Sequence, residues 1–262
     1  MGEIMVAGID VGSLSTDAVI LRNRQVTGSS IIRTGADPKA AAERALDEAL
    51  TMAGEKRERL CFVVGTGYGR FSIPLAHRQI TEITCHALGA HYMHPETRTV
   101  IDIGGQDSKV IRINGRGEVD DFMMNDKCAA GTGRFLEVMA QVLEVQMEDM
   151  GALGAGSTKQ VSISSTCTVF AESEVVSLIA AGHAKEDIIS SLHEAVAERV
   201  AGLALRIGVR ETVAMTGGVA KNRGIVKALE GKLGTTIVVP PEPQLVGALG
   251  AALLAHEQAL RS

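Results

Sequence analysis

Two short segments of the chain place an aspartate at the end of an apolar run and follow it with small residues. They are Gly8–Ser13 and Val100–Gly105, and their aspartates, Asp10 and Asp102, lie 92 positions apart. A strand would carry each aspartate to its tip, and the small residues after it would let backbone N–H groups approach an anion closely. Two such cradles facing each other predict a nucleotide site, and their separation fits two copies of a half-domain.

A third pair of small residues, Gly217 and Gly218, follows the strand expected over Thr212–Met215 and precedes a helix. Backbone without side chains could approach a flat base or a ribose there. Each of the three segments could also be an ordinary turn, because a single glycine-rich turn is weak evidence for a binding site. Three such segments, each after an apolar strand, favour the binding interpretation.

The bulk composition limits the classes of partner. A chain of 262 residues, 45% of them hydrophobic, can form one large domain or two half-domains with a substantial core. The net charge is −5 and no long run of like charge occurs, so nucleic acid is not an expected partner. The apolar stretches contain glycine and are shorter than a bilayer span, and no signal-peptide pattern precedes the first strand. We therefore expect a cytoplasmic protein that binds no membrane.

The elements expected from periodicity occur in two similar sets. The first set has strands at Met5–Ile9, Asp17–Leu21, Ser29–Arg33 and Leu60–Val64, and helices after Asp37-Pro38 and over Glu82–Tyr92. The second set has strands at Thr99–Ile103, Ser108–Ile113, Glu118–Met124, Thr212–Met215 and Thr236–Val239, and helices over Asn222–Leu233 and from Gln244. A largely helical insertion is expected over Gly133–Ile207. The pattern predicts an α/β fold of two related halves.

The four cysteines fall into two groups. Cys128 and Cys167 lie near predicted helix N-termini, where unpaired N–H groups and the positive dipole end lower a thiol pKa and favour a thiolate or cluster sulfur. Cys61 lies in an apolar strand and Cys85 on an apolar helix face, so both are expected to be small core residues.

Three interpretations of Cys128 and Cys167 stay open at this point. An iron–sulfur cluster takes four thiolates, so two cysteines per chain would need a twofold dimer. They could also be a redox dithiol, although nothing places the sulfurs within bridging distance, or two unrelated buried residues. His86, His91 and His94 have no carboxylate at ligand spacing, and we interpret them as surface or core residues.

Several sequence segments resemble those of one family, the ATP-dependent activators (reductase components) of 2-hydroxyacyl-CoA dehydratases. This family is related to the ATPase subunits of benzoyl-CoA reductase. The segments span nearly the whole chain, at Gly8–Ser13, Thr66–Arg70, Ile101–Asp107, Asn125–Phe135, Ser162–Glu174 and Gly247–Ala252. The resemblance implies the α/β fold shared by acetate and sugar kinases, Hsp70 and actin, with two ribonuclease-H-like half-domains around a nucleotide cleft. The halves would be residues 1–95 and 96–243, with a C-terminal helix at about 244–262 packing back on the first.

The same resemblance implies roles for individual residues. Asp10 and Asp102 would organise Mg²⁺ through water and, with Gln106, form the catalytic set. ATP or ADP would be bound by Gly12, Ser13, Leu14, Ser15, Thr16, Gly104, Gly105, Gln106, Gly217, Gly218 and Gln244. One 4Fe-4S cluster would be held between the subunits of a homodimer by Cys128 and Cys167 of each chain.

The implied function is that of an ATP-dependent, low-potential one-electron donor. Electrons from ferredoxin or flavodoxin would pass through the cluster to a larger iron–sulfur acceptor, either a 2-hydroxyacyl-CoA dehydratase, a double-cubane-cluster protein or a system like benzoyl-CoA reductase. Two other classes share the fold, a small-molecule kinase and a scaffold like actin. For the kinase, the sequence offers no clear substrate base in the cleft. One position departs from the family pattern, because Asp17 stands where relatives often carry a lysine.

Overall fold

The computed structural model describes residues 3–126, 128–163 and 167–261. The first part of the chain forms five strands and two helices. They are β1 (Met5–Val11), β2 (Ser15–Arg22), β3 (Gln25–Arg33), α1 (Pro38–Ala53), β4 (Phe62–Thr66), β5 (Arg78–Gln79) and α2 (Glu82–Met93). The strands and helices predicted here are confirmed in kind and order, although β1 to β3 are longer than expected, β4 lies two residues later than the predicted Leu60–Val64, and β5 was not expected.

The second part repeats this order around an insertion. Its elements are β6 (Thr99–Ile103), β7 (Ser108–Ile113), β8 (Val119–Asn125), β9 (Val213–Thr216), α7 (Arg223–Leu233), β10 (Ile237–Val238) and α8 (Val246–Ala259). The insertion between β8 and β9 contains α3 (Gly133–Leu143), α4 (Met150–Ala155), α5 (Thr168–Ala180) and α6 (Lys185–Ile207). The helical insertion and its bounds agree with the prediction.

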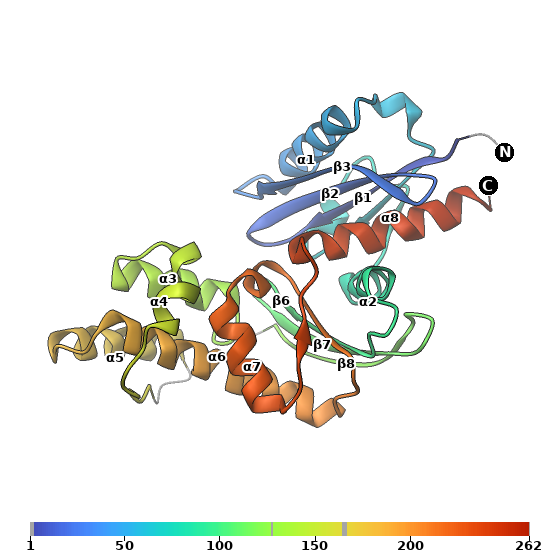
Figure 1. Ribbon diagram of the computed structural model, residues 1–262. Helices are drawn as coiled ribbons and strands as arrows, with labels where there is room; N and C mark the ends of the chain where they lie inside the picture. Colours follow the sequence, from blue (N-terminus) through green and yellow to red (C-terminus); the bar gives the residue numbers. More distant parts are fainter. Residues whose placement is uncertain (1–2, 127, 164–166, 262) are drawn as a thin grey trace.

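The two parts form two sheets with the same strand order, β3-β2-β1-β4-β5 and β8-β7-β6-β9-β10 (Figure 1). In both, the first three strands pair antiparallel, and the fourth runs parallel to the first. The register is also the same, because Asp10 pairs with Thr66 across β1 and β4 as Asp102 pairs with Thr216 across β6 and β9. The two aspartates therefore occupy equivalent positions.

Local signals explain where the elements begin and end. The side chain of Asp37 accepts a hydrogen bond from the Ala40 N–H at the start of α1, and Pro38 occupies its first turn. The helix ends at Gly54, whose φ of 67° is a left-handed conformation that glycine adopts without strain. Its apolar face is buried against the first sheet, because Ala45, Leu46 and Ala49 cluster with β1 residues.

Helices cover both faces of each sheet. In the first sheet α1 packs on one face and α8 on the other. Helix α2 contributes Ile83, Ala87 and Ala90 to a cluster with Val100 and Ile111 of the second sheet. Figure 1 shows α2 and α8 together between the two sheets. The division into half-domains 1–95 and 96–243, with the helix 244–262 assigned to the first, stays a prediction.

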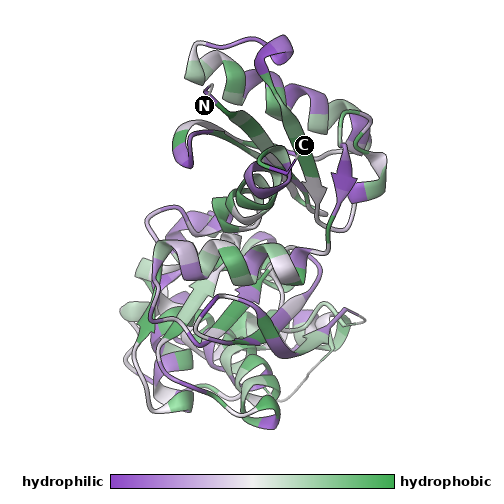
Figure 2. Cartoon of the chain, turned by 90° about the vertical axis from the view of Figure 1, so that its right-hand side faces the viewer, coloured by the Kyte–Doolittle hydropathy of each residue, from purple (hydrophilic) through white to green (hydrophobic). Residues whose placement is uncertain are grey.

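The largest core lies in the second part and includes the insertion. Ile188, Leu192, Val196 and Val200 recur at helical spacing along α6, and all four are buried there. Figure 2 shows the hydrophobic strands enclosed by helices that carry hydrophilic residues on their outer sides. Within the described ranges, no helix has the length and apolarity needed to cross a membrane.

Candidate functional site

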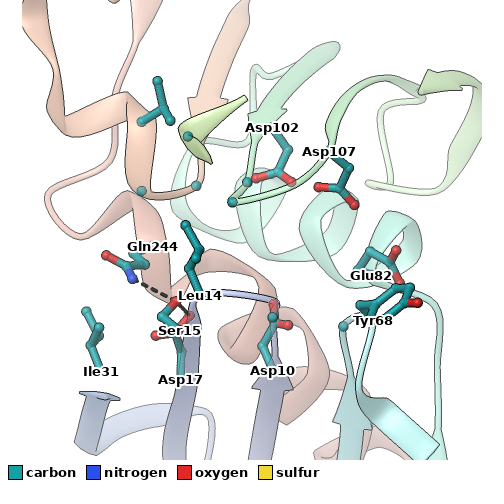
Figure 3. Close-up of a pocket in the computed structure, with 18 of the residues that line it drawn as sticks. Asp10, Leu14, Ser15, Asp17, Ile31, Tyr68, Glu82, Asp102, Asp107 and Gln244 are labelled. Carbon is teal, nitrogen blue, oxygen red and sulfur yellow. Dashed lines mark hydrogen bonds between the residues drawn. The ribbon is translucent and has the colours of Figure 1, made fainter. Parts of the chain in front are cut away.

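A cleft of about 460 Å³ opens between the two sheets. Its walls come from the ends of the strands that the sequence identified: Asp10, Gly12 and Ser15 on one side, and Asp102 and Gly104 on the other. Figure 3 shows the aspartates of the two halves facing each other across the space, with Gln244 at one edge and Tyr68 and Glu82 at the other.

The two strand tips form the same turn. The Gly12 N–H donates to the Ser15 carbonyl at 2.9 Å between β1 and β2, and the Gly104 N–H donates to the Asp107 carbonyl at 3.0 Å between β6 and β7. The turns also touch each other, because a Cβ on Gly105 would lie 2.5 Å from Leu14 Cγ and 2.7 Å from Ser13 Oγ. A side chain at Gly105 would require Leu14 and Ser13 to move. The two cradles therefore face each other, as the repeat predicted.

A glycine with positive φ packs closely against the carboxylate of each aspartate. Gly67 has a φ of 86°, and a Cβ there would lie 2.3 Å from Asp10 Oδ1. Gly217 has a φ of 84°, and a Cβ there would lie 2.8 Å from Asp102 Oδ1. Both positions need a left-handed backbone and close approach, which explains why both are glycine.

Asp102 is buried and well paired. Its carboxylate accepts hydrogen bonds from Thr216 Oγ1 at 2.9 Å and Lys109 Nζ at 3.3 Å, and His86 Nδ1 lies 3.4 Å away. Burial alone would raise the pKa of Asp102, but the coulombic effects of the neighbouring His86 and Lys109 and these hydrogen bonds outweigh burial and hold its pKa below the ordinary value. Asp102 is therefore a stable anion in the cleft.

Lys109 links two carboxylates in the second half. Its ammonium lies 3.3 Å from Asp102 Oδ2 and 2.8 Å from Asp107 Oδ1. Burial acts to lower the pKa of Lys109, but Asp102 and Asp107 more than offset it and raise the pKa. Burial raises the pKa of Asp107 despite this contact.

Asp10 and Asp17 lack an equivalent ammonium partner among the described residues. Burial raises the pKa of Asp10 to about 6, with His86 acting in the opposite direction from 3.7 Å. Burial and the neighbouring Asp10 raise the pKa of Asp17 to about 8. The first half of the cleft is thus rich in carboxylates with little compensating charge.

Most of the predicted nucleotide residues line this cleft. They are Asp10, Gly12, Leu14, Ser15, Asp102, Gly104, Gly105, Gly217, Gly218 and Gln244. Three others do not line it: Ser13 contacts the opposite turn, Thr16 is buried with its hydroxyl bonded to Thr34, and Gln106 is exposed. The role assigned to each residue stays a prediction.

The sequence did not identify His86, Lys109, Asp107 and Glu82 as part of the cleft. His86 is buried, which is one of the two expected environments, but it lies between Asp10 and Asp102. Its carboxylate neighbours are far away in sequence, so spacing within its helix could not reveal them. Lys109 had a usable signal, because it follows Asp102 at the spacing at which Asp17 follows Asp10.

Three of the four cysteines lie in the structural environment that the sequence predicted. Cys167 is exposed at the N-cap of α5, and the neighbouring residues 164–166 lie outside the described ones. Cys128 is half-buried against the core before α3, and Cys85 is buried, which raises its pKa to about 12. The expectation for Cys61 was wrong. Its backbone N–H donates to the Met5 carbonyl at 2.8 Å, but the residue lies just before β4, which begins at Phe62, and it is exposed.

Across residues 3–126, 128–163 and 167–261, no three His, Cys, Asp or Glu side chains are grouped so that they could hold a metal ion by themselves.

The duplicated sheets and the cleft between them define the actin-like and sugar-kinase class of α/β proteins. A glucokinase of the ROK family from Streptomyces griseus, solved with glucose and AMPPNP, has this fold, with a TM-score of 0.60, 15% identity, and coverage of 97% of this chain and 99% of its own. At that identity the likeness concerns the fold alone.

The chain belongs to the BadF/BadG/BcrA/BcrD ATPase family, whose profile matches residues 7–255. The activator of lactoyl-CoA dehydratase from Anaerotignum propionicum is 51% identical over 253 residues, which cover 96% of this chain and 97% of that protein. The activator of the 2-hydroxyisocaproyl-CoA dehydratase from Clostridium difficile, solved with bound ADPNP, is 48% identical with a TM-score of 0.94 and covers 98% of this chain and 96% of its own.

Proposed function

We propose that this protein is an ATP-driven electron donor for a 2-hydroxyacyl-CoA dehydratase or a similar iron–sulfur enzyme. The observation that carries the proposal is the position of Cys167, exposed at the N-cap of α5 in the insertion that also contains Cys128. In a chain that also has an ATPase cleft, an exposed thiol at a helix N-terminus is well placed to act as a ligand of an iron–sulfur cluster.

The cleft fits a nucleotide with Mg²⁺. The tight turns at Gly12 and Gly104 present backbone near the strand tips, and side chains are excluded at Gly105 and Gly217. Asp102, held as an anion, and Asp10 would orient the water shell of the metal ion, and Gly218 and Gln244 would border the adenosine. Mg²⁺ supplies charge neutralisation for the phosphates as the terminal one is transferred to water.

The thiols fit a cluster shared by two copies of the chain. Cys128 and Cys167 offer two sulfur ligands per chain, and a twofold axis would bring four together. Helix α5 supports this arrangement, because it exposes Val169, Phe170 and Val176 beside Cys167. A second copy of the chain is the occupant that would cover this apolar surface and complete the ligand set at once.

The two sites are connected through the second half. Cys128 follows β8, which pairs with β7, and β7 carries Lys109 at the bottom of the cleft. Closure around the terminal phosphate would shift this sheet and change the surroundings of the cysteines. About 1.4 kcal/mol of differential nucleotide binding corresponds to about 59 mV for one electron, so ATP can drive an electron from ferredoxin or flavodoxin to lower potential.

Iron analysis of anaerobically purified variants tests the proposal. Cys128→Ala and Cys167→Ala should each abolish iron binding, whereas the wild type should contain about two iron atoms per chain, half of a shared four-iron cluster. Cys61→Ala and Cys85→Ala are the matched controls and should keep the wild-type iron content. Iron at the wild-type level in either of the first two variants would rule out the shared cluster.

A further inference from the structure

The internal repeat makes Asp17 the counterpart of Lys109. Asp17 pairs with Asp10 across β1 and β2, and Lys109 pairs with Asp102 across β6 and β7 in the same register. Side chains at directly opposed positions of antiparallel strands lie on the same face, about 5 Å apart at Cβ. In the second half this pair combines an acid with a base, and in the first half it combines two acids.

Lys109 shows what this position does in the second half. Its ammonium lies between Asp102 and Asp107, at 3.3 Å and 2.8 Å from their carboxylates. The turn bonds of Gly12 and Gly104 make Ser15 the counterpart of Asp107. The equivalent positions in the first half are therefore occupied by Asp10, Ser15 and Asp17, whose side chains all end in oxygen atoms.

Asp17 has an unused buried oxygen in this place. The residue is 5% exposed and lines the cleft. Its Oδ2 accepts from the Ser15 hydroxyl at 3.2 Å, and that hydroxyl accepts from Gln244 Nε2 at 2.8 Å, which fixes its orientation (Figure 3). Within the described part of the chain, Asp17 Oδ1 is fully buried and has no hydrogen-bond partner. A buried carboxylate oxygen without a donor is costly unless a ligand satisfies it.

We propose that the first cradle binds a divalent cation between Asp10 and Asp17, in the place that the Lys109 ammonium occupies in the second cradle. Two carboxylates and a hydroxyl are hard oxygen ligands, which suit Mg²⁺ or Mn²⁺, with water or a phosphate oxygen completing the shell. A cation there supplies the positive charge that a lysine would bring to the phosphates. This cation site shares one residue, Asp10, with the proposed nucleotide site, and to that extent it rests on the proposed function. The cation should bind even when no nucleotide is present.

Titration of the nucleotide-free protein with Mn²⁺, followed by the electron paramagnetic resonance signal of free Mn²⁺, tests this site. The wild type should bind one Mn²⁺ at a saturable site, and Asp17→Asn, which keeps the shape, should weaken that affinity about tenfold or more. Asp17→Lys should bind no Mn²⁺ there, because its own ammonium fills the place. Asp37→Asn, at the exposed cap of α1, is the control carboxylate and should keep the wild-type affinity.

Thermal unfolding in the same buffers checks that the variants fold and gives a second readout. Mg²⁺ should raise the melting temperature of the nucleotide-free wild type and leave that of Asp17→Asn unchanged. The proposal is overturned if the wild type shows no saturable Mn²⁺ binding, or if Asp17→Asn binds Mn²⁺ as tightly as the wild type. Nucleotide binding measured separately distinguishes either result from a failure of the proposed ATP site.

Discussion

The two cradles have the same backbone and opposite charge balance. In both, an aspartate lies at the end of a strand and a glycine with positive φ packs against its carboxylate. In both, the turn that follows the strand is closed by the same backbone hydrogen bond. In the second cradle Lys109 compensates Asp102 and Asp107, whereas in the first Asp10 faces Asp17. The two repeats thus share the backbone geometry that can approach a phosphate. They differ in the side chains that neutralise the aspartate of each cradle.

The largest difference between the cradles should appear when the compensating charge is removed. Lys109→Met would leave the buried Asp102 and the partly buried Asp107 without their ammonium, and we expect it to lower the free energy of unfolding by about 3–5 kcal/mol. Asp17→Asn is the matched change in the first cradle and should cost less than about 1 kcal/mol, because it removes a repulsion. Urea denaturation of both variants measures the contrast, and equal losses would show that the cradles are not electrostatically different.

The packing of α2 against α8 gives a second, smaller effect. Helices α2 and α8 cross so closely that a Cβ on Gly250 would lie only 1.8 Å from the Cys85 carbonyl oxygen. We expect Gly250→Ala to destabilise the protein by about 1–3 kcal/mol through overpacking.

Gly202→Ala, in α6 with open space around it, is the control and should stabilise by up to about 1 kcal/mol. Denaturation midpoints of the two variants test the packing, and a Gly250→Ala protein as stable as the wild type would contradict the close crossing.

The pH dependence of stability should separate the cradles further. The raised pKa values of Asp10, about 6, and Asp17, about 8, mean that these two groups hold protons in the folded protein that they release in the unfolded chain above pH 4. Their contribution to stability without cation or nucleotide should therefore fall as the pH rises, by up to about 1.4 kcal/mol per pH unit for each group, until the pH passes its folded pKa. The lowered pKa of His193, about 4, acts in the opposite sense below about pH 6.5.

Between pH 6 and 8 this fall should come mainly from Asp17, so Asp17→Asn should flatten the curve there. Asp102 acts in the opposite sense, because its lowered pKa gives stability that is lost only below about pH 4. Chemical denaturation at a series of pH values checks both signs, and a stability that rises from pH 6 to 8 in the wild type would refute the assignment.

The sequence was informative wherever a single strand or turn carries the signal. The Asp-then-glycine phrases, their 92-position repeat and the capping pair Asp37-Pro38 predicted the strand tips and the facing cradles. These features depend on contacts within a hairpin or a helix end, so the order of residues encodes them directly. The stripe of α6 was visible for the same reason, because helical spacing alone places its apolar residues on one face.

Contacts between the halves were not accessible in the same way. His86 contacts Thr216 across 130 positions, and the packing of α2 on the second sheet brings its ring close to both aspartates. Cys61 shows a second reason why sequence prediction can fail. The apolar run correctly predicted a strand, but only the pairing with β1 shows that this strand begins at Phe62. Register and helix crossing are tertiary properties, which residue patterns constrain weakly.

The central claim is that nucleotide in the cleft controls an iron–sulfur cluster at Cys128 and Cys167. The most direct measurement is the rate at which a chelator removes iron from the reduced protein without nucleotide, with ADP and with a non-hydrolysable ATP analogue. We predict faster iron loss with the ATP analogue than in the other two states, because closure of the cleft re-aims the segments that carry the cysteines. Equal rates in all three states would contradict the account and leave an ATPase whose cluster is independent of its nucleotide.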